Sequence, residues 1–207
     1  MNTALVNIID DNEDLRLSLD SLFRSVGLQT RMFGSATDFL ASPRDECVSC
    51  LVLDVRLPGL SGLDFQDQLS KSGVCIPVVL MTGHGDIPMS VRAMKAGAID
   101  FLVKPFRDQD MLDAVSAALA SDKHRRENGN ELTIIANRYS ELTEREKQVM
   151  VLVTSGLMNK QVAGRLSLSE VTVKIHRGST MRKMEARTIA DLVRMADLLK
   201  LRETKEG

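Results

Sequence analysis

The stretch Cys50-Leu51-Val52-Leu53-Asp54 decides the fold expected for the first half of this chain. It is a short apolar run that ends in a carboxylate, and similar runs stand on both sides of it, with helical patterns between them. Runs of this length and composition are typical of β-strands. The predicted strands are 4–9, 28–33, 50–54, 77–82 and 99–104.

The segments between these strands predict helices. Leu15, Leu19, Leu22 and Val26 recur at spacings of three and four residues, which places them on one face of a helix. Similar stripes run through 35–41, 62–71, 86–96 and 107–120. Because parallel strands need crossover connections, the alternation predicts an α/β fold, a doubly wound (βα)5 unit around a parallel five-stranded sheet. Its strands are expected to be apolar on both faces, since helices cover both.

Size and composition fit two small soluble domains. The chain has 207 residues, of which 43% are hydrophobic. No apolar run approaches the length of a membrane span and the N-terminus lacks the basic start of a secretory signal, so we expect a cytoplasmic protein. Cys47, Cys50 and Cys75 are an odd number, which argues against a disulfide framework. Because Cys50 begins a strand, packing explains Cys47-x-x-Cys50 better than a zinc or redox site does.

Charge is distributed unevenly along the chain. Residues 138–207 carry 14 Lys and Arg against 9 Asp and Glu, a charge of +5, and the rest of the chain carries −6. A basic end is compatible with a polyanionic partner. Two ordinary solvated surfaces would explain the same charges equally well, so charge alone does not decide between them.

The second half of the chain is helical in pattern. Residues 121–130 are charged and lack an apolar period, so a linker, or a helical extension that stops near Gly129, is predicted over 121–137, between domains at 3–120 and 138–203. Thr143-Glu144-Arg145-Glu146 is a capping box that starts a helix, and Ser169 and Thr188 can cap two later ones. The predicted helices are 143–155, 159–166, 170–184 and 188–201. A tight turn at Ser167-Leu168-Ser169 makes the second and third a helix-turn-helix, a DNA-binding motif.

Charged and hydroxyl side chains stand at the ends of four predicted strands. Asp10 and Asp11 follow the first, and Asp54, Thr82 and Lys104 end the third, fourth and fifth. Parallel strands have their carboxyl ends at one edge of the sheet, where ligands bind, so these side chains are expected to meet. Together they predict a site for a divalent metal and a phosphoryl group, in which Thr82 hydrogen-bonds one phosphoryl oxygen and Lys104 pairs with another.

The metal expected at this site is Mg²⁺, which prefers a few carboxylates, phosphate oxygens and water. Asp11 and Asp54 are expected to bind it directly, Asp10 through water, and Arg56 through its backbone carbonyl. An alternative is a phosphatase or phosphotransferase with Asp54 as nucleophile. Such an enzyme would need a second carboxylate two residues on as acid–base catalyst, and Arg56 stands there, so we expect a regulator and not an enzyme.

Residues 3–122 resemble the receiver domain of two-component response regulators. The resemblance is carried by the acidic pair, Asp54, Leu57-Pro58-Gly59, Gly62, Thr82-Gly83, Phe101 and Lys104-Pro105. It implies that a sensor histidine kinase transfers a phosphoryl group to Asp54, and that Phe101 rotates into space vacated by Thr82. It also implies that the phosphorylated receiver forms a homodimer through Val91, Lys95 and Arg107. His84, beside the site, is more simply a surface loop residue.

Residues 138–200 resemble the LuxR-type helix-turn-helix of the NarL/FixJ family. The motifs are Leu142-Thr143-Glu144-Arg145-Glu146, Gly156, Asn159-Lys160, Leu166-Ser167-Leu168-Ser169 and Thr172-Val173-Lys174-Ile175-His176-Arg177. The resemblance implies a phosphorylation-activated transcriptional regulator that binds double-stranded promoter DNA. The loop 82–88 and residues 101–106 are most similar to the FixJ branch. That branch implies activation of nitrogen-fixation genes downstream of a FixL-like oxygen-sensing kinase, although related regulators serve other signals.

The second helix of the motif is expected to contact DNA. Val171, Ile175 and Met181 are predicted to pack inward. Thr172, Lys174 and His176 are expected nearest the base edges, and Lys160, Arg177, Arg182 and Lys183 mainly at phosphates. A solvated helix face is the alternative for each cation. The last helix, with Ile189 and Leu192, either forms a dimer contact or closes the small core. A domain of this type could also contact RNA polymerase instead of DNA.

Overall fold

The computed structural model describes residues 4–43, 46–83 and 87–201. These divide into two compact units, with the boundary between Arg126 and Glu127. The boundary falls inside the predicted linker. Each unit has its own core and is described by itself.

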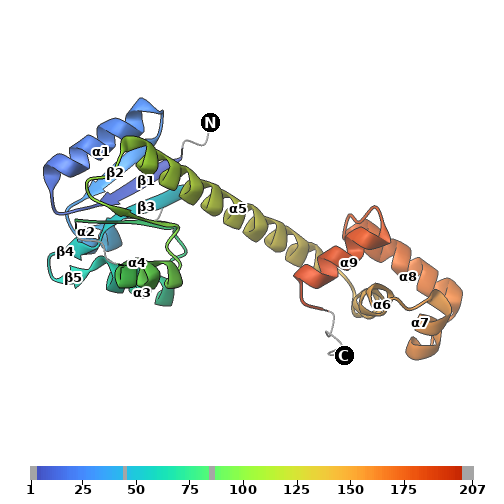
Figure 1. Ribbon diagram of the computed structural model, residues 1–207. Helices are drawn as coiled ribbons and strands as arrows, with labels where there is room; N and C mark the ends of the chain where they lie inside the picture. Colours follow the sequence, from blue (N-terminus) through green and yellow to red (C-terminus); the bar gives the residue numbers. More distant parts are fainter. Residues whose placement is uncertain (1–3, 44–45, 84–86, 202–207) are drawn as a thin grey trace. The chain divides into compact units, whose positions relative to one another are not determined.

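The first unit is built on a five-stranded parallel sheet. Its strands are β1 (Leu5–Ile9), β2 (Gln29–Phe33), β3 (Ser49–Asp54), β6 (Val78–Thr82) and β7 (Asp100–Val103). They lie side by side in the order β2-β1-β3-β6-β7 (Figure 1). A short antiparallel pair, β4 (Arg56–Leu57) and β5 (Leu60–Ser61), follows β3. The predicted doubly wound α/β fold is therefore confirmed, with strand ends that differ from the predicted ones by one residue at most.

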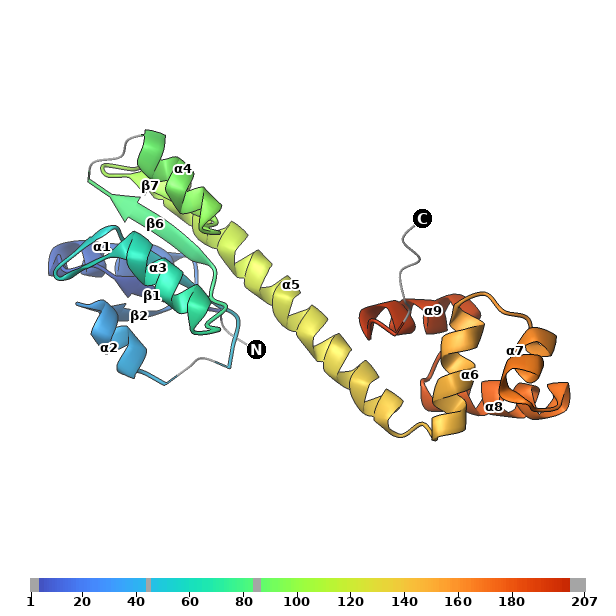
Figure 2. The same cartoon turned by 90° about the horizontal axis from the view of Figure 1, so that it is seen from below.

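Helices cover both faces of this sheet (Figure 2). They are α1 (Glu13–Ser25), α2 (Ala36–Ala41), α3 (Gly62–Lys71), α4 (Ile87–Lys95) and the start of α5 (Asp108–Ser140). Alternate strand residues point to opposite faces, so the core has two halves. Val52 and Met81 pack with α1 and α5 on one side, and Leu51 and Leu53 pack with α2, α3 and α4 on the other.

Cys50 belongs to the first of these core halves. It is fully buried and its thiol is free. Burial, and secondly the charge of Asp122, raises the pKa of the thiol to about 12. A thiol this hard to ionise is neither a ready nucleophile nor a ready metal ligand, which supports the packing interpretation.

One expectation about the sheet is wrong. The strands were expected to be apolar on both faces, but in β2 the side chains of Gln29, Arg31 and Met32 are exposed. β2 lies at the edge of the sheet, with β1 as its only neighbour. An edge position leaves part of a strand in water, where polar and charged side chains are favoured.

α5 is a single helix of 33 residues. It passes through Gly129, so the expectation that a helical extension stops near that glycine is wrong. A glycine in an exposed helix interior costs only about 1 kcal/mol relative to alanine, and the turns on both sides are held by other contacts. The chain therefore stays helical from Asp108 into the second unit.

The second unit contains the end of α5 and four further helices. These are α6 (Glu144–Thr154), α7 (Asn159–Leu166), α8 (Glu170–Lys183) and α9 (Ile189–Leu198). The side chains of Thr143, Ser169 and Thr188 accept hydrogen bonds from backbone N–H groups at three of the helix starts, as predicted. Ser167 lies in the left-handed region, with φ of 54°, at the turn between α7 and α8. The predicted helix-turn-helix is therefore present.

α9 contributes mostly to the small core. Leu192, Met195 and Ala196 are buried there together with Ile135 from the end of α5. Ile189 and Leu198 keep exposed apolar surface. Core closure therefore accounts for most of the apolar residues of this helix.

Within the described part of the chain, no helix combines the length and the apolar character that a membrane span requires.

Candidate functional site

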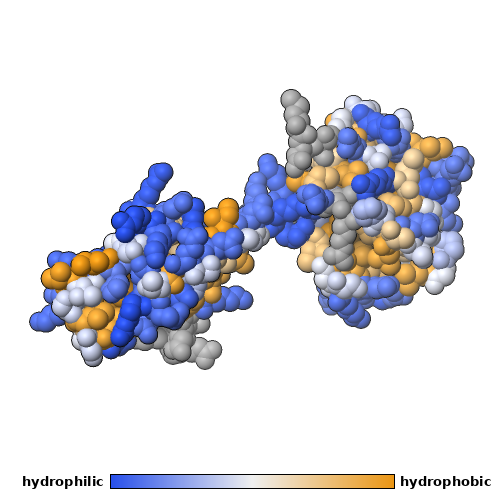
Figure 3. Space-filling model, turned by 180° about the vertical axis from the view of Figure 1, so that it is seen from behind, coloured by the Kyte–Doolittle hydropathy of each residue, from blue (hydrophilic) through white to orange (hydrophobic). Residues whose placement is uncertain are grey.

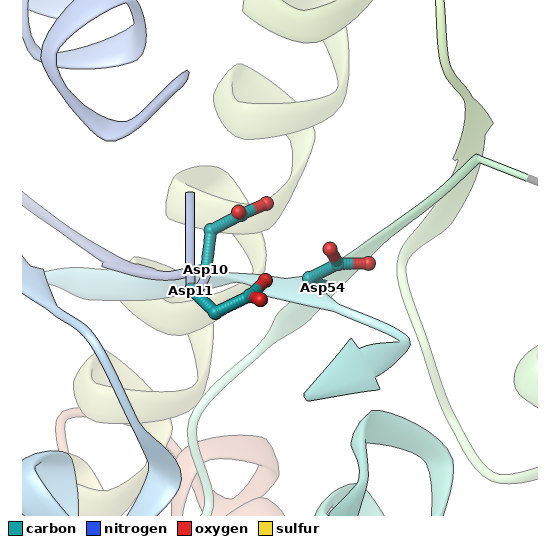
Figure 4. Close-up of side chains that lie close together, drawn as sticks. All are labelled: Asp10, Asp11 and Asp54. Carbon is teal, nitrogen blue, oxygen red and sulfur yellow. The ribbon is translucent and has the colours of Figure 1, made fainter. Parts of the chain in front are cut away.

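Three carboxylates meet at one edge of the sheet. Asp10 and Asp11 directly follow β1, and Asp54 ends β3. One oxygen of each carboxylate lies within 4.8 Å of the others (Figure 4). β1 and β3 are adjacent parallel strands with Ile9 opposite Leu53, so the acidic residues that follow them are brought level. Asp10 and Asp54 are buried, whereas Asp11 is exposed.

Lys104 connects two of these carboxylates. Its Nζ donates hydrogen bonds to Asp10 Oδ2 at 2.6 Å and to Asp54 Oδ2 at 2.9 Å. The lysine follows β7, and its peptide bond to Pro105 is cis. Its backbone N–H donates to the carbonyl of Thr82 at 2.7 Å, which fixes the start of this loop against β6.

Burial and charge act against each other at this cluster. Burial raises the pKa of Asp10 more than its hydrogen bonds with Lys104 and Asn12 lower it. Burial would lower the pKa of Lys104, but the hydrogen bonds and charges of Asp10 and Asp54 outweigh it and raise that pKa. Two buried carboxylates, those of Asp10 and Asp54, therefore share the single positive charge of Lys104.

The residues around Asp54 are held closely. Its Oδ1 accepts a hydrogen bond from the backbone N–H of Arg56 at 3.1 Å, while the Arg56 side chain is exposed. Gly62 packs directly against the backbone of Asp54: a Cβ on Gly62 would lie 2.3 Å from the Asp54 carbonyl oxygen. Only glycine fits there without movement of the backbone. Pro58 and Gly59 form the turn of the β4–β5 pair, with Gly59 at φ of 81°.

Thr82 and Phe101 lie on the strands next to Asp54. Thr82 ends β6 and is fully buried, and β6 pairs with β3 so that Asp54 stands opposite Met81. Phe101 is half-buried in β7 and packs against the core on the α4 side. The structure therefore brings together the predicted acidic pair, Asp54, Thr82 and Lys104, with Phe101 one strand away.

The donor set fits a hard divalent cation. It consists of three carboxylates beside the backbone of Arg56, and Mg²⁺ prefers oxygen ligands of this kind. Asp10 and Asp54, both buried, share one ammonium, because Lys104 pairs with each of them. A bound cation would balance the remaining negative charge.

A second set of candidate residues lies on the helix-turn-helix. Lys160, Lys174 and Arg182 are exposed, and His176 is half-buried. The Thr172 hydroxyl lies 2.7 Å from Ser169 Oγ at the start of α8. Arg177 Nη1 donates to Asn159 Oδ1 at 3.2 Å, which links α8 to α7.

Lys183, which was expected at phosphates, has hydrogen-bond partners within the second unit. Its Nζ donates to Glu146 Oε2 at 2.8 Å and to the carbonyl of Glu141 at 3.2 Å. Burial alone would raise the pKa of Glu146, but hydrogen bonds from Lys183, Ser179 and Thr143 outweigh it and lower that pKa to about 2. This ion pair joins the end of α8 to the start of α6.

The expected packing face of α8 is wrong. Val171 and Ile175 are 67% and 65% exposed, whereas Val173 and Thr180 are fully buried. Thr180 can occupy a core position because its hydroxyl donates to the carbonyl of His176 at 2.9 Å. The half-buried Met181 does pack against the small core. The two exposed apolar residues therefore lie on the accessible side of the helix with Lys174.

The residues expected at a dimer contact are all exposed. Val91 and Lys95 are four residues apart and lie on one face of α4. Arg107 stands just before α5 and forms an ion pair with Asp110 in the first turn of that helix. Ile87, Met94 and Val103 add exposed apolar surface near them, which the sequence did not single out. His84 lies outside the described residues.

An open pocket of about 760 Å³ lies next to Lys104. α1 supplies one wall with Leu15, Leu19 and Leu22, and the segment after β7 supplies the other with Pro105 and Phe106. Lys104 is the residue of the candidate site that lines this pocket, and Asp10, Asp11 and Asp54 do not line it.

Comparison with known proteins identifies both units. Residues 6–116 match the response regulator receiver domain, and residues 140–196 match the bacterial regulatory proteins of the luxR family. The chain belongs to the NarL/FixJ family of two-component response regulators. The resemblance found in the sequence is thereby confirmed. Members with this pair of domains are transcription regulators that depend on phosphorylation, and the pair implies a sensor kinase and promoter DNA as partners.

Several relatives match nearly the whole chain. Nodulation protein W of Bradyrhizobium diazoefficiens is 55% identical over 95% of this chain and 86% of its own length. The response regulator protein TodT of Pseudomonas putida is 45% identical, over 95% and 87%. The transcriptional regulatory protein FixJ of Rhizobium meliloti is 40% identical, over 95% and 96%.

Solved structures agree with this assignment. The response regulator StyR matches 94% of this chain and 98% of its own, with a TM-score of 0.82 and 46% identity. Full-length FixJ from B. japonicum matches 98% and 100%, with a TM-score of 0.59 and 34% identity.

Proposed function

We propose that this protein is a transcriptional activator that binds promoter DNA after phosphorylation of Asp54. The single observation that supports it best is that the ammonium of Lys104 donates hydrogen bonds to both Asp10 and Asp54. These contacts lie at the edge of the sheet where β6 ends in Thr82. A sensor histidine kinase would supply the phosphoryl group. In the transfer the P–N bond to the kinase histidine breaks, and a P–O bond to Asp54 forms.

The chain's own residues orient this reaction. Asp11 and Asp54 would hold Mg²⁺ directly, Asp10 through water, and Arg56 through its carbonyl. When bound, the ion neutralises charge on the phosphoryl oxygens. Lys104 would move part of its hydrogen bonding from Asp54 to a phosphoryl oxygen.

Thr82 would hydrogen-bond another phosphoryl oxygen, and Phe101 would follow it inward. The packing of Phe101 against the α4 side of the core supports this, because a rotation there alters the surface of α4. We infer that the altered surface dimerises through Val91, Lys95 and Arg107. The exposed apolar side chains around Val91 favour such a contact.

The DNA-binding role is assigned to α8 and the turn before it. We place Lys174, His176 and Thr172 at base edges, and Val171 and Ile175 against apolar groups such as thymine methyls. Lys160 on α7 and the two arginines of α8, Arg177 and Arg182, are placed at phosphates. Contact with RNA polymerase would follow on the bound promoter.

We assign residues 3–120 to the receiver, 121–137 to the linker and 138–203 to the DNA-binding domain, in a cytoplasmic protein.

Two regulons are candidates. Relatives named FixJ, at 40–41% identity, favour nitrogen-fixation genes and a FixL-like kinase. Nodulation protein W, at 55% identity, favours nodulation genes. Sequencing the DNA that the protein occupies in its own cell separates the two.

The test of the proposed function is Asp54→Asn in the full chain. DNA affinity is measured by fluorescence anisotropy with and without acetyl phosphate, on duplexes selected from a random pool by the treated wild-type protein. We expect the wild type to bind more tightly with the donor and the variant not to respond. Asp64→Asn is the matched control, because Asp64 is exposed on α3 and pairs only with Arg92 in the described contacts. A response that survives in Asp54→Asn contradicts the proposal.

The same titrations address the two alternatives. Binding that does not weaken with salt would favour a protein-interaction module over a DNA-binding protein. Turnover of an external phosphoester would favour an enzyme.

A further inference from the structure

Arg16 of α1 reaches back to the acidic pair. Its Nη1 donates a hydrogen bond to the backbone carbonyl of Asp10 at 2.6 Å. The guanidinium also lies near Gly34, the residue after β2, because a Cβ built on Gly34 would come 3.9 Å from Nη1. The Arg16 side chain is half-buried. It therefore occupies a defined place beside the ends of β1 and β2.

The first turn of α1 fixes where this side chain starts. The side chain of Asn12 accepts a hydrogen bond from the backbone N–H of Leu15 at 3.1 Å, which caps the helix. The Asn12 backbone N–H donates in turn to Asp10 Oδ1 at 2.9 Å, and the Asn12 carbonyl accepts from the N–H of Arg16 at 3.1 Å. The acidic pair and the first turn of α1 are thus connected through both backbone and side chains.

Each polar group of Asp10 has a partner, and Arg16 supplies one of them. The backbone N–H of Asp10 donates to the carbonyl of Phe33 at 3.3 Å. Its two carboxylate oxygens accept hydrogen bonds from the Asn12 N–H and from Lys104. Asp10 is fully buried, so water cannot replace a partner that is removed. Loss of the Arg16 guanidinium therefore removes the partner of a buried carbonyl, which is costly.

The same carbonyl decides the direction in which the chain enters Asp11. A peptide unit is planar, so the Asp10 carbonyl oxygen lies in one plane with the nitrogen and Cα of Asp11. A partner that fixes this oxygen also fixes where the Asp11 side chain begins. Of the three clustered carboxylates, those of Asp10 and Asp54 are buried and that of Asp11 is exposed. Arg16 thus acts on the carboxylate that burial does not hold in place.

We propose that Arg16 is a positioning residue for the metal site, whose guanidinium holds the peptide between Asp10 and Asp11 so that Asp11 faces the cation. This role rests on the proposed function, in which Asp11 binds Mg²⁺ directly. Two other roles of Arg16 predict different results. A purely structural role lowers the stability of the first unit without changing its affinity for Mg²⁺. A purely electrostatic role has the opposite sign, because removal of a cation beside the cluster strengthens the binding of another cation.

Calorimetric titration of the full chain with Mg²⁺, without a phosphodonor, separates these roles. Arg16→Met keeps a long side chain but loses the donor and the charge, and it should weaken Mg²⁺ binding about tenfold. Urea unfolding without Mg²⁺, followed by circular dichroism, measures the structural cost separately. If Arg16→Met does not fold, Arg16→Gln takes its place and is judged by the same outcomes. An affinity for Mg²⁺ equal to that of the wild type, or higher, overturns the proposal.

The control must remove a cation without touching the acidic pair. Hydrophilic side chains are spread over the surface of both units (Figure 3), so the net charge can be changed away from the site. Arg24 lies about two turns beyond Arg16 on the same helix, is exposed, and pairs with Asp20. Arg24→Met should leave the affinity for Mg²⁺ unchanged. A loss as large as that in Arg16→Met overturns the proposal, because the effect would then not depend on contact with Asp10.

The initial rate of Asp54 phosphorylation by acetyl phosphate, measured at several Mg²⁺ concentrations, is a second readout. Arg16→Met should raise the Mg²⁺ concentration for half-maximal rate about tenfold. The rate at saturating Mg²⁺ should stay nearly unchanged, because excess cation compensates for a weaker site. A loss that saturating Mg²⁺ does not restore overturns the positioning role. A wild type that binds Mg²⁺ but is not phosphorylated overturns the proposed function instead, and the calorimetry still decides the role of Arg16.

Discussion

The ion pair between Glu146 and Lys183 can be tested by Glu146→Gln. Glutamine keeps the backbone contact of the capping box at Thr143 but removes the charge that faces Lys183. A fall in pKa from the usual 4.5 to about 2 corresponds to about 3 kcal/mol at neutral pH. The Lys183 side chain is 34% exposed, so solvent screening reduces the expected loss of unfolding free energy to about 2 kcal/mol.

The loss of unfolding free energy caused by Glu146→Gln should depend on pH in a defined direction. The pKa of Glu146 is lower in the folded protein than in the unfolded chain, so its contribution is complete above about pH 5 and is lost as the pH falls toward 2. The loss caused by Glu146→Gln should therefore be largest at pH 7 and shrink steadily between pH 5 and pH 3.

Urea unfolding followed by tyrosine fluorescence measures this directly. The chain has one tyrosine and no tryptophan, and Tyr139 packs in the core of the second unit, so the signal reports that unit alone. Glu144→Gln is the control, because Glu144 pairs with Lys147 but is 82% exposed, and it should cost less than about 0.5 kcal/mol. Equal losses in the two variants, or a loss from Glu146→Gln that does not change with pH, would refute the reasoning.

Three further predictions concern DNA and the phosphoryl site. Lys183→Met should destabilise the second unit but leave the salt dependence of DNA binding unchanged, whereas Lys160→Met should reduce the slope of log affinity against log salt by about 1, as salt titrations by anisotropy will show. Ile175→Ala should weaken binding roughly tenfold without altering that slope, as expected for about two methylene groups that lose contact with a base; an altered slope would point to a lost phosphate contact instead. Gly62→Ala should cost the receiver about 2 kcal/mol or more and abolish the response to acetyl phosphate, because its methyl would overlap the Asp54 carbonyl; unfolding followed by circular dichroism that matches the wild type would contradict this.

The sequence predicted the receiver fold and the composition of its site well, and the reason is physical. Apolar runs of strand length mark buried parallel strands, and all parallel strands end at the same edge. Asp10, Asp54 and Thr82 could therefore be expected together from their positions at strand ends alone. The closeness of Gly62 to the Asp54 carbonyl could not be predicted in this way, because it depends on the path of the backbone after β3.

The inner face of α8 was harder to predict because a polar residue, Thr180, occupies one of its core positions while two of its apolar residues are exposed. Thr180 is buried with its hydroxyl bonded within its own helix, while Val171 and Ile175 face outward, so choosing the apolar residues as the inner face rotated the helix the wrong way. The partner of Lys183, Glu146, stands 37 residues earlier in the chain, so a local sequence pattern could not indicate this ion pair. A helix that must offer side chains to DNA is under less pressure to keep its exposed face polar than a helix that faces only water. Hydrophobic periodicity is for that reason least reliable in a helix expected to contact DNA, and the exposure of Ile175 beside Lys174 is consistent with the DNA-binding face proposed for α8.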